Sequence, residues 1–211
     1  MSKFYTPLSN IKIDIEKLTK EIFQFWPLDL NARDTSTSFT TAKKYVDDVN
    51  YDFSLYRGIS KYVPDNRKIK VYSDGEFDHD IVYWPKILEN TYMKELGDYF
   101  AKILNVTHYR ARASYYNSLD RAFIGELHND PHTPHRIHIA LKTDPNVKWL
   151  LADQNNNTHY IHQPADGSPV LLETWCTKHQ VIVPTNSIRM HFWFQYYTEL
   201  DQSLLDHLLT V

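Results

Sequence analysis

The feature that most constrains the fold is a run of short β-prone segments in the second half of the chain. After Asn105, seven segments rich in β-branched and aromatic residues alternate with turn-forming clusters such as T-D-P-N, D-Q-N-N-N and P-A-D-G-S. Short strands at regular spacing are typical of an antiparallel sandwich or jelly roll, because brief connections join strands of opposite direction. The predicted strands are residues 109–116, 136–142, 147–151, 158–162, 169–175, 180–183 and 188–196.

The first half of the chain contains two helical patterns. Apolar residues recur at helical spacing over residues 14–26, where Asp14 is suited to cap the helix and Pro27 to end it. A second amphipathic pattern, with Leu88 among its apolar residues, opens at Pro85 and continues to residue 103.

The remaining segments complete a single predicted domain. Polar clusters predict loop over residues 28–50 with a short strand at residues 38–41, and short β-like pieces are expected between residues 51 and 83. A set of leucines near the end predicts a closing helix within residues 198–211. We therefore expect one domain over residues 1–211, in which residues 1–107 support a β core formed by residues 108–197.

Composition limits the kinds of partner. The 211-residue chain has 23 Lys plus Arg against 26 Asp plus Glu, a net charge of -3, so a basic surface for nucleic acid is not expected. The single Cys176 excludes disulfide frameworks and cysteine zinc sites by count. The first residues lack the apolar core of a signal peptide and no stretch has the length of a membrane span, so we expect a cytoplasmic protein with no membrane partner.

Three residues have the pattern of a metal site. His128 and Asp130 are two positions apart, so both side chains can point to the same face of a strand end, and His179 follows much later in the chain. Two histidines and one carboxylate on one face of an octahedral metal leave three positions open, which is the ligand set of Fe(II) oxygenases. The alternative for Asp130 is ordinary turn chemistry in N-D-P, and most of the eleven histidines are expected to have no metal role.

Arg189 is the candidate anion-binding residue. It lies in S-I-R-M-H-F-W-F, where apolar or aromatic residues occupy both faces of a strand, so a charged side chain there needs a buried anionic partner. A bound dicarboxylate would supply that partner. A structural Asp or Glu is the alternative.

The order of these motifs resembles a known superfamily. H-x-D is followed by Arg136-Ile137-His138, by P-A-D-G-S-P-V, and by His179 with Arg189 ten residues later. Over residues 108–197 this pattern resembles the Fe(II)- and 2-oxoglutarate-dependent oxygenases, in particular the aspartyl/asparaginyl β-hydroxylase-like group. The resemblance implies a double-stranded β-helix, that is, a mainly β jelly roll of cupin type with flanking helices.

The resemblance also implies roles for individual residues. His128 and His179 would bind Fe(II), and Arg189 would hold the distal carboxylate of the co-substrate 2-oxoglutarate. Arg136 and His138 would contact the co-substrate near its metal-chelating end. Well-known members of the β-hydroxylase group lack a carboxylate at the position of Asp130, whereas this chain has the complete triad of the wider superfamily.

A hydroxyl on the strand before the site is expected to share the distal carboxylate. Ser114, Tyr116 and Ser118 are the candidates, and Ser114 is the prediction. Two subclasses fit less well, because enzymes that repair alkylated nucleic acid carry a second arginine where this chain has Gln195, and prolyl 4-hydroxylase-like enzymes usually carry lysine in place of Arg189. Arg110, Arg112, Trp149 and Trp175 are further candidates for substrate contact.

The predicted function is that of a non-haem Fe(II)- and 2-oxoglutarate-dependent dioxygenase, using O2 to hydroxylate an amino acid or a peptide or protein side chain. The first alternative is a cupin-like protein that binds a metal or small molecule without oxygenase activity, in which Arg189 is dispensable. The second is a structural β-sandwich with incidental histidines. The sequence specifies neither the substrate nor the oligomeric state.

Overall fold

The computed structural model describes residues 5–28, 34–41, 43, 46–48, 82–130, 135–153, 155–197, 202–208 and 210. The β-like pieces expected between residues 51 and 83 lie outside the described residues, except for Val82 and Tyr83. Tyr83 forms an isolated bridge with Thr41.

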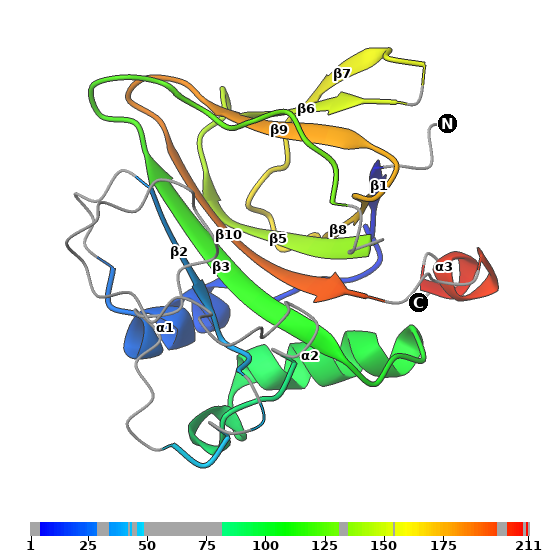
Figure 1. Ribbon diagram of the computed structural model, residues 1–211. Coiled ribbons are helices and arrows are strands. Elements are labelled where there is room, and N and C mark those ends of the chain that lie inside the picture. The colour runs from blue at the N-terminus through cyan, green and yellow to red at the C-terminus, as the bar shows by residue number, and fades with distance from the viewer. Residues whose placement is uncertain are drawn as a thin grey trace.

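Two antiparallel sheets face each other, as Figure 1 shows. The larger sheet has six strands in the order β1-β8-β5-β10-β3-β2, and the smaller has four in the order β4-β9-β6-β7. The larger sheet consists of β1 (Tyr5–Pro7), β2 (Asp34–Ser38), β3 (Tyr109–Asn117), β5 (His135–Thr143), β8 (Val170–Glu173) and β10 (Ile188–Tyr196). The smaller consists of β4 (Phe123–Ile124), β6 (Lys148–Ala152), β7 (Thr158–Ile161) and β9 (Lys178–Val183).

This architecture confirms the predicted mainly β jelly roll with flanking helices. Each of the seven strands predicted after Asn105 is present, with ends that shift by up to two residues. Turn chemistry explains why the strands stop where they do. Asn156 and Asn186 adopt the left-handed conformation, with φ of 61° each, and so does Gly167, with φ of 84°. A Cβ at Gly167 would lie 2.5 Å from the carbonyl oxygen of Ile13, so only glycine fits there.

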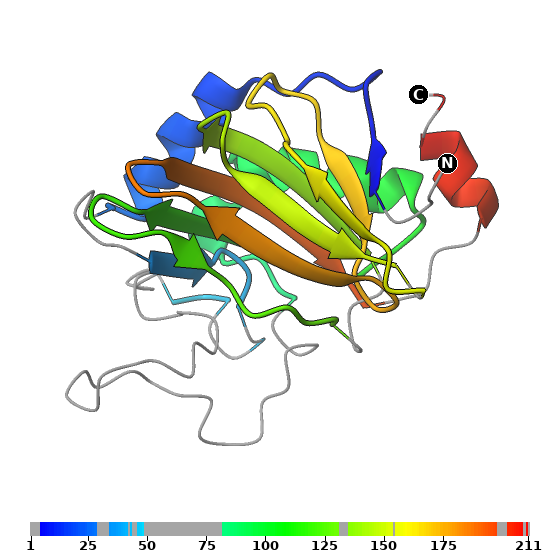
Figure 2. The same ribbon diagram turned by 90° about the horizontal axis from the view of Figure 1, so that it is seen from above.

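Two helices cover the outer face of the larger sheet (Figures 1 and 2). α1 (Ile15–Phe25) is capped by the Asp14 carboxylate, which accepts from the backbone N–H of Lys17, as predicted. α2 (Tyr92–Ile103) begins later than the pattern indicated. The predicted start at Pro85 is instead a short 3-10 helix, η4 (Lys86–Leu88), and Thr91 caps α2.

Two further predictions concern the edges of the fold. The short strand expected at residues 38–41 was misplaced, because the strand that pairs with β3 is Asp34–Ser38, with Ser36 opposite Ser114. The closing helix is present as α3 (Gln202–Leu208), where Leu208 is buried. None of the helices in the described part of the chain has the length and hydrophobicity that a membrane crossing requires.

The alternation of β10 places the core and the site on opposite faces of the larger sheet. Met190, Phe192 and Phe194 belong to the main hydrophobic core, which includes buried residues of both covering helices such as Leu18 and Phe100. The intervening residues of β10, including Arg189 and Trp193, therefore project toward the smaller sheet. The site lies between the two sheets.

Candidate active site

Backbone pairing brings the three predicted metal ligands together. His128 and His179 face each other in an isolated antiparallel bridge, in which each backbone N–H donates to the other's carbonyl, at 3.1 Å and 2.7 Å. The backbone N–H of Asp130 donates to the carbonyl of Thr174 at 2.8 Å, directly after the end of β8. Because these bonds fix the backbone of two distant segments, the three side chains converge without any metal.

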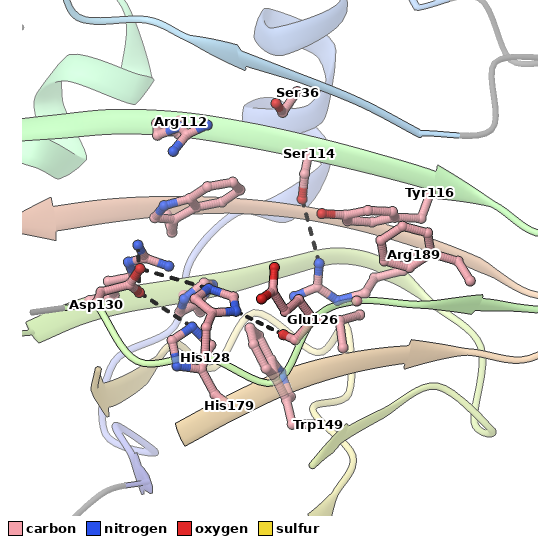
Figure 3. Close-up of a pocket in the computed structure, with 16 residues that line it drawn as sticks. Ser36, Arg112, Ser114, Tyr116, Glu126, His128, Asp130, Trp149, His179 and Arg189 are labelled. Carbon is pink, nitrogen blue, oxygen red and sulfur yellow. Dashed lines mark hydrogen bonds and ion pairs between the residues drawn. The ribbon is translucent and has the colours of Figure 1, made fainter. Parts of the chain in front are cut away.

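The side-chain geometry suits a single ion, as Figure 3 shows. One ligand atom from each residue lies within 4.8 Å of the other two. The Nε2 atoms of His128 and His179 lie 3.7 Å and 3.3 Å from the carboxylate oxygens of Asp130. Each Nδ1 instead faces a backbone carbonyl, that of Glu126 at 2.8 Å and that of Thr177 at 3.3 Å. A hydrogen bond from Nδ1 leaves the Nε2 lone pair for a metal.

The charge states also suit a metal. Burial lowers the pKa of His179 below its ordinary value, which favours the neutral imidazole that a metal requires. Burial alone would raise the pKa of Asp130, but the charge of Arg136 and the close contact with His179 outweigh it and hold that pKa well below the usual range. The site therefore offers an ionised carboxylate and a neutral imidazole that is 3% exposed.

Arg136 has a different contact from the predicted one. Its Nη2 atom forms an ion pair with Oδ2 of Asp130 at 2.7 Å, and the two side chains are 12% and 18% exposed. The prediction placed Arg136 against the co-substrate. A guanidinium has five N–H donors, so contact with Asp130 leaves donors for a second anion, and the co-substrate role stays a prediction.

Arg189 is buried, and no carboxylate of the described residues is its partner. It is 2% exposed, and among the described residues no Asp or Glu forms an ion pair with it. Its Nη1 donates a long 3.4 Å hydrogen bond to the hydroxyl of Ser114, and its guanidinium lies over the rings of Trp149 and Tyr116, at 4.6 Å and 5.6 Å from the centroids. Burial lowers the pKa of Arg189 to about 10. The structural Asp or Glu considered as an alternative is thus absent from the described part of the chain.

One cavity of about 360 Å³ joins the ligand cluster to Arg189. This volume falls within the range of small-molecule sites, about 300–1,000 Å³. The cavity wall contains every predicted ligand and co-substrate residue and several residues that the sequence did not point to. The wall consists of Ser36, Arg112, Ser114, Tyr116, Phe123, Gly125, Glu126, His128, Asp130, Arg136, His138, Trp149, His179, Val181, Arg189 and Trp193.

The three hydroxyl candidates separate clearly. Ser114 and Tyr116 line the cavity beside Arg189 (Figure 3). Ser118 does not line it, because its hydroxyl donates to the carbonyl of Val183. Of the missed residues, Trp193 had a signal in the sequence, since it lies on the same face of its strand as Arg189. Ser36 had none.

The further candidates for substrate contact divide evenly. Arg112 and Trp149 line the cavity. Arg110 does not, because its buried guanidinium donates from Nε to the hydroxyl of Ser38. Trp175 is 44% exposed and lies outside the cavity wall.

His138 is a buried, neutral member of the cavity wall. Its ring stacks on Trp193 with centroids 5.5 Å apart and meets Trp149 edge-on at 5.0 Å. Burial, followed by the positive charge of Arg136, holds its pKa well below the ordinary value. Neither ring nitrogen has a hydrogen-bond partner among the described residues.

No protein-family model and no curated protein matches this chain. Among solved structures, IDO from Bacillus thuringiensis is similar over 93% of this chain and 92% of its own, with 13% identity and a TM-score of 0.53. The viral collagen prolyl hydroxylase vCPH from Paramecium Bursaria Chlorella virus-1, solved with 2OG, has 10% identity and a TM-score of 0.46 over 93% and 98% of the two chains.

A third neighbour is more distant. A prolyl-4-hydroxylase from Pseudomonas putida has 14% identity and a TM-score of 0.37 over 50% of this chain, which covers 58% of the length of that enzyme. Prolyl hydroxylases and 2OG-Fe(II) oxygenases thus recur among the structural neighbours at low identity. The two facing antiparallel sheets, and the full-length likeness to the Bacillus protein, identify the fold of this chain as a double-stranded β-helix, the fold of the 2-oxoglutarate oxygenases among its neighbours.

Proposed function

We propose that this protein is an Fe(II)- and 2-oxoglutarate-dependent dioxygenase. The observation that carries the proposal is the combination, in one cavity, of a three-residue metal-ligand cluster and a buried arginine without a carboxylate partner among the described residues. A metal alone would explain the cluster but would leave Arg189 without a counter-ion. A dicarboxylate that binds the metal at one end and Arg189 at the other explains both.

Each group of residues in the cavity would have a separate role. His128, Asp130 and His179 would hold Fe(II), which together with O2 and 2-oxoglutarate converts a substrate C–H to C–OH while the co-substrate yields succinate and CO2. Arg189 and the Ser114 hydroxyl would anchor the distal carboxylate. The rings of His138, Trp149 and Trp193, which line the cavity, would keep bulk water away from the co-substrate.

The finer assignment is part of the same proposal. We place the protein near the aspartyl/asparaginyl β-hydroxylase-like group on the Arg136-Ile137-His138 motif, and expect hydroxylation of an amino acid or a peptide or protein side chain. An arginine at position 189 supports this placement over the prolyl 4-hydroxylase-like enzymes, which usually carry lysine there. The carboxylate of Asp130 distinguishes this chain from well-known members of the β-hydroxylase group, which lack a carboxylate at this position.

The test is an anaerobic titration of the purified protein with Fe(II) and 2-oxoglutarate, followed through the visible charge-transfer band of an iron-bound 2-oxo acid. The band is expected in the wild type. It should be absent in His179→Ala, which lacks a ligand, and should need far more 2-oxoglutarate in Arg189→Ala, which lacks the distal anchor. Succinate release in air then provides a readout for candidate substrates.

The matched control is His159→Ala, which removes an exposed histidine of β7 that lies outside the cavity wall. It should retain the wild-type band. A folded wild type without any band would refute the proposal and leave the cupin-like and structural alternatives. A band of equal strength in His179→Ala would show that iron binds elsewhere.

A further inference from the structure

Trp149 reaches across the space between the two sheets. It lies in β6 of the smaller sheet, where it pairs with Val181 of β9 and Ile161 of β7. Its side chain lines the cavity and is 6% exposed. Figure 3 shows the indole projecting from the smaller sheet toward the side chain of Arg189, which comes from β10 of the larger sheet. A residue of one sheet is therefore placed against the candidate anion anchor of the other.

The indole lies close to the Arg189 guanidinium. Cζ of Arg189 is 4.6 Å from the centroid of the Trp149 ring and 5.6 Å from that of Tyr116. Both distances are within the roughly 6 Å over which an aromatic face attracts a cation, and a tryptophan face attracts it most strongly. Because Arg189 is 2% exposed, water competes little for this attraction. The Trp149 ring, which is the nearer of the two, therefore has the larger part in holding the guanidinium.

Polar groups of the described residues restrain Arg189 only weakly. Its hydrogen bond to the Ser114 hydroxyl is long, at 3.4 Å, and no described Asp or Glu forms an ion pair with it. An arginine side chain has several rotatable bonds, so a guanidinium without a firm partner can adopt several positions. A ligand that must first order such a side chain binds less tightly than one that finds it already in place. Restraint by the aromatic rings supplies that order before the co-substrate binds.

Trp149 is itself held by a small hydrophobic cluster. Its buried neighbours in that cluster are Leu151 of β6 and Leu172 of β8. The ring also meets His138 edge-on, with the two centroids 5.0 Å apart. These contacts fix the indole independently of Arg189, because close packing leaves a large rigid side chain few alternative positions. The ring can therefore act as a rigid support for a flexible partner.

We propose that Trp149 is a positioning residue, whose indole holds the Arg189 guanidinium in place for the distal carboxylate of 2-oxoglutarate. The sequence indicated Trp149 as a candidate for contact with the primary substrate, but its ring lies against Arg189. The role is separate from the exclusion of water, which any apolar side chain of similar size would also provide. This inference rests on the proposed function, because it names the residue that prepares Arg189 for the co-substrate.

The test compares two replacements of Trp149 in protein saturated with Zn(II), a redox-inert substitute for Fe(II). Trp149→Leu keeps an apolar side chain and removes the aromatic face, whereas Trp149→Phe keeps such a face. Calorimetric titration with 2-oxoglutarate should give a dissociation constant about five- to thirtyfold higher in Trp149→Leu, the effect of losing one buried cation–π contact. Trp149→Phe should recover most of that loss. The matched control is Trp175→Leu, which removes a tryptophan that is 44% exposed and outside the cavity wall, and it should bind as wild type.

Two further measurements separate positioning from general damage to the site. Pyruvate has the 2-oxo acid group but no distal carboxylate, so its affinity for the Zn(II) protein, measured by NMR titration, should be the same in Trp149→Leu and wild type. In an Arg189→Met background, the effect of Trp149→Leu on 2-oxoglutarate should fall to roughly twofold or less, because the partner of the ring is gone. Thermal melts check that each variant is folded. If Trp149→Leu does not fold, the same comparisons are made with Trp149→Met, which fills more of the space.

The results that would overturn the positioning role differ from those that would overturn the proposed function. The role is refuted if Trp149→Leu binds 2-oxoglutarate like the wild type, if pyruvate is weakened equally, or if the effect persists in the Arg189→Met background. Failure of the Zn(II)-saturated wild type to bind 2-oxoglutarate would instead refute the proposed function. Urea unfolding of the ligand-free protein then decides the contact on its own. Trp149→Leu should lower the unfolding midpoint more in the wild-type background than in Arg189→Met, and an equal fall in both would refute the contact.

Discussion

Two arginines of the cavity wall, the buried Arg189 and the partly buried Arg136, should respond in opposite ways to replacement when the metal and co-substrate are absent. Arg189 has no carboxylate partner among the described residues, whereas Arg136 forms an ion pair with Asp130 at 2.7 Å. Replacing each by methionine keeps a long, flexible side chain and removes the charge. We expect Arg189→Met to stabilise the ligand-free protein and Arg136→Met to destabilise it, because only the second change leaves a charge unpaired.

The magnitude follows from the surroundings of Arg189. The fall in its pKa from the ordinary 12.5 to about 10, caused by burial, corresponds to a cost of about 3 kcal/mol for keeping the guanidinium charged. The cation–π contacts with Trp149 and Tyr116 return about 1–2 kcal/mol, and the long hydrogen bond to Ser114 adds little. The cost of burial exceeds these contributions, so Arg189→Met should raise the free energy of unfolding by about 1–2 kcal/mol. For a chain of this size, the midpoint of thermal unfolding should rise by about 2–8 °C.

Arg136→Met should lower the free energy of unfolding by about 1–3 kcal/mol. This loss is smaller than for a fully buried pair, because both partners retain some exposure.

The assay is thermal unfolding followed by circular dichroism, with and without Zn(II) and 2-oxoglutarate. Co-substrate at a hundred times its dissociation constant should stabilise the wild type by about 2.7 kcal/mol and should leave Arg189→Met unchanged. The order of the two proteins should therefore reverse between the ligand-free and the saturated samples. A ligand-free Arg189→Met that melts well below wild type, or one that 2-oxoglutarate still protects, would refute the reasoning.

Three other predictions concern acid stability, packing and the metal. Burial, aided by the charge of Arg189, holds the pKa of His191 well below its ordinary value of 6.5. As pH falls below 6.5, His191 therefore binds a proton in the unfolded chain but stays neutral in the folded chain. The free energy of unfolding should then decline by about 1.4 kcal/mol per pH unit for this group, and urea titrations of His191→Gln at pH 6 and 5 should lack that part of the slope. Gly97→Ala would place a Cβ 2.6 Å from Cε2 of Tyr109 and should cost about 1–3 kcal/mol in denaturant melts, whereas Gly125→Ala, with its nearest atoms at 3.6 Å, should cost far less. Asp130→Asn should weaken Zn(II) binding tenfold or more in calorimetry, since it removes the charged ligand, and wild-type affinity in this variant would exclude Asp130 as a ligand.

Much of the fold was predictable from the sequence, because it rests on local patterns. The strands after Asn105 are bounded by turn residues that adopt left-handed conformations, and Asp14 caps α1 through its own carboxylate. β2 was misplaced because D-T-S-T-S has no apolar alternation, and only pairing with β3 makes it a strand. The start of α2 was misplaced because Pro85 and Thr91 both resemble a helix start, and the chain uses the second.

The candidate site also has features that follow from local sequence patterns and features that depend on tertiary packing. The sequence alone predicted His128, Asp130, His179 and Arg189, because two-residue spacing and the alternation of a strand determine which side chains share a face. Only the tertiary structure decided what each one meets: the ion pair of Arg136 with Asp130, the absence of a described carboxylate beside Arg189, and the contact of Arg189 with the Trp149 ring. The physical reason is that strand periodicity is a local property of the chain. The register between strands distant in sequence, and the burial it produces, depend on how the whole core packs.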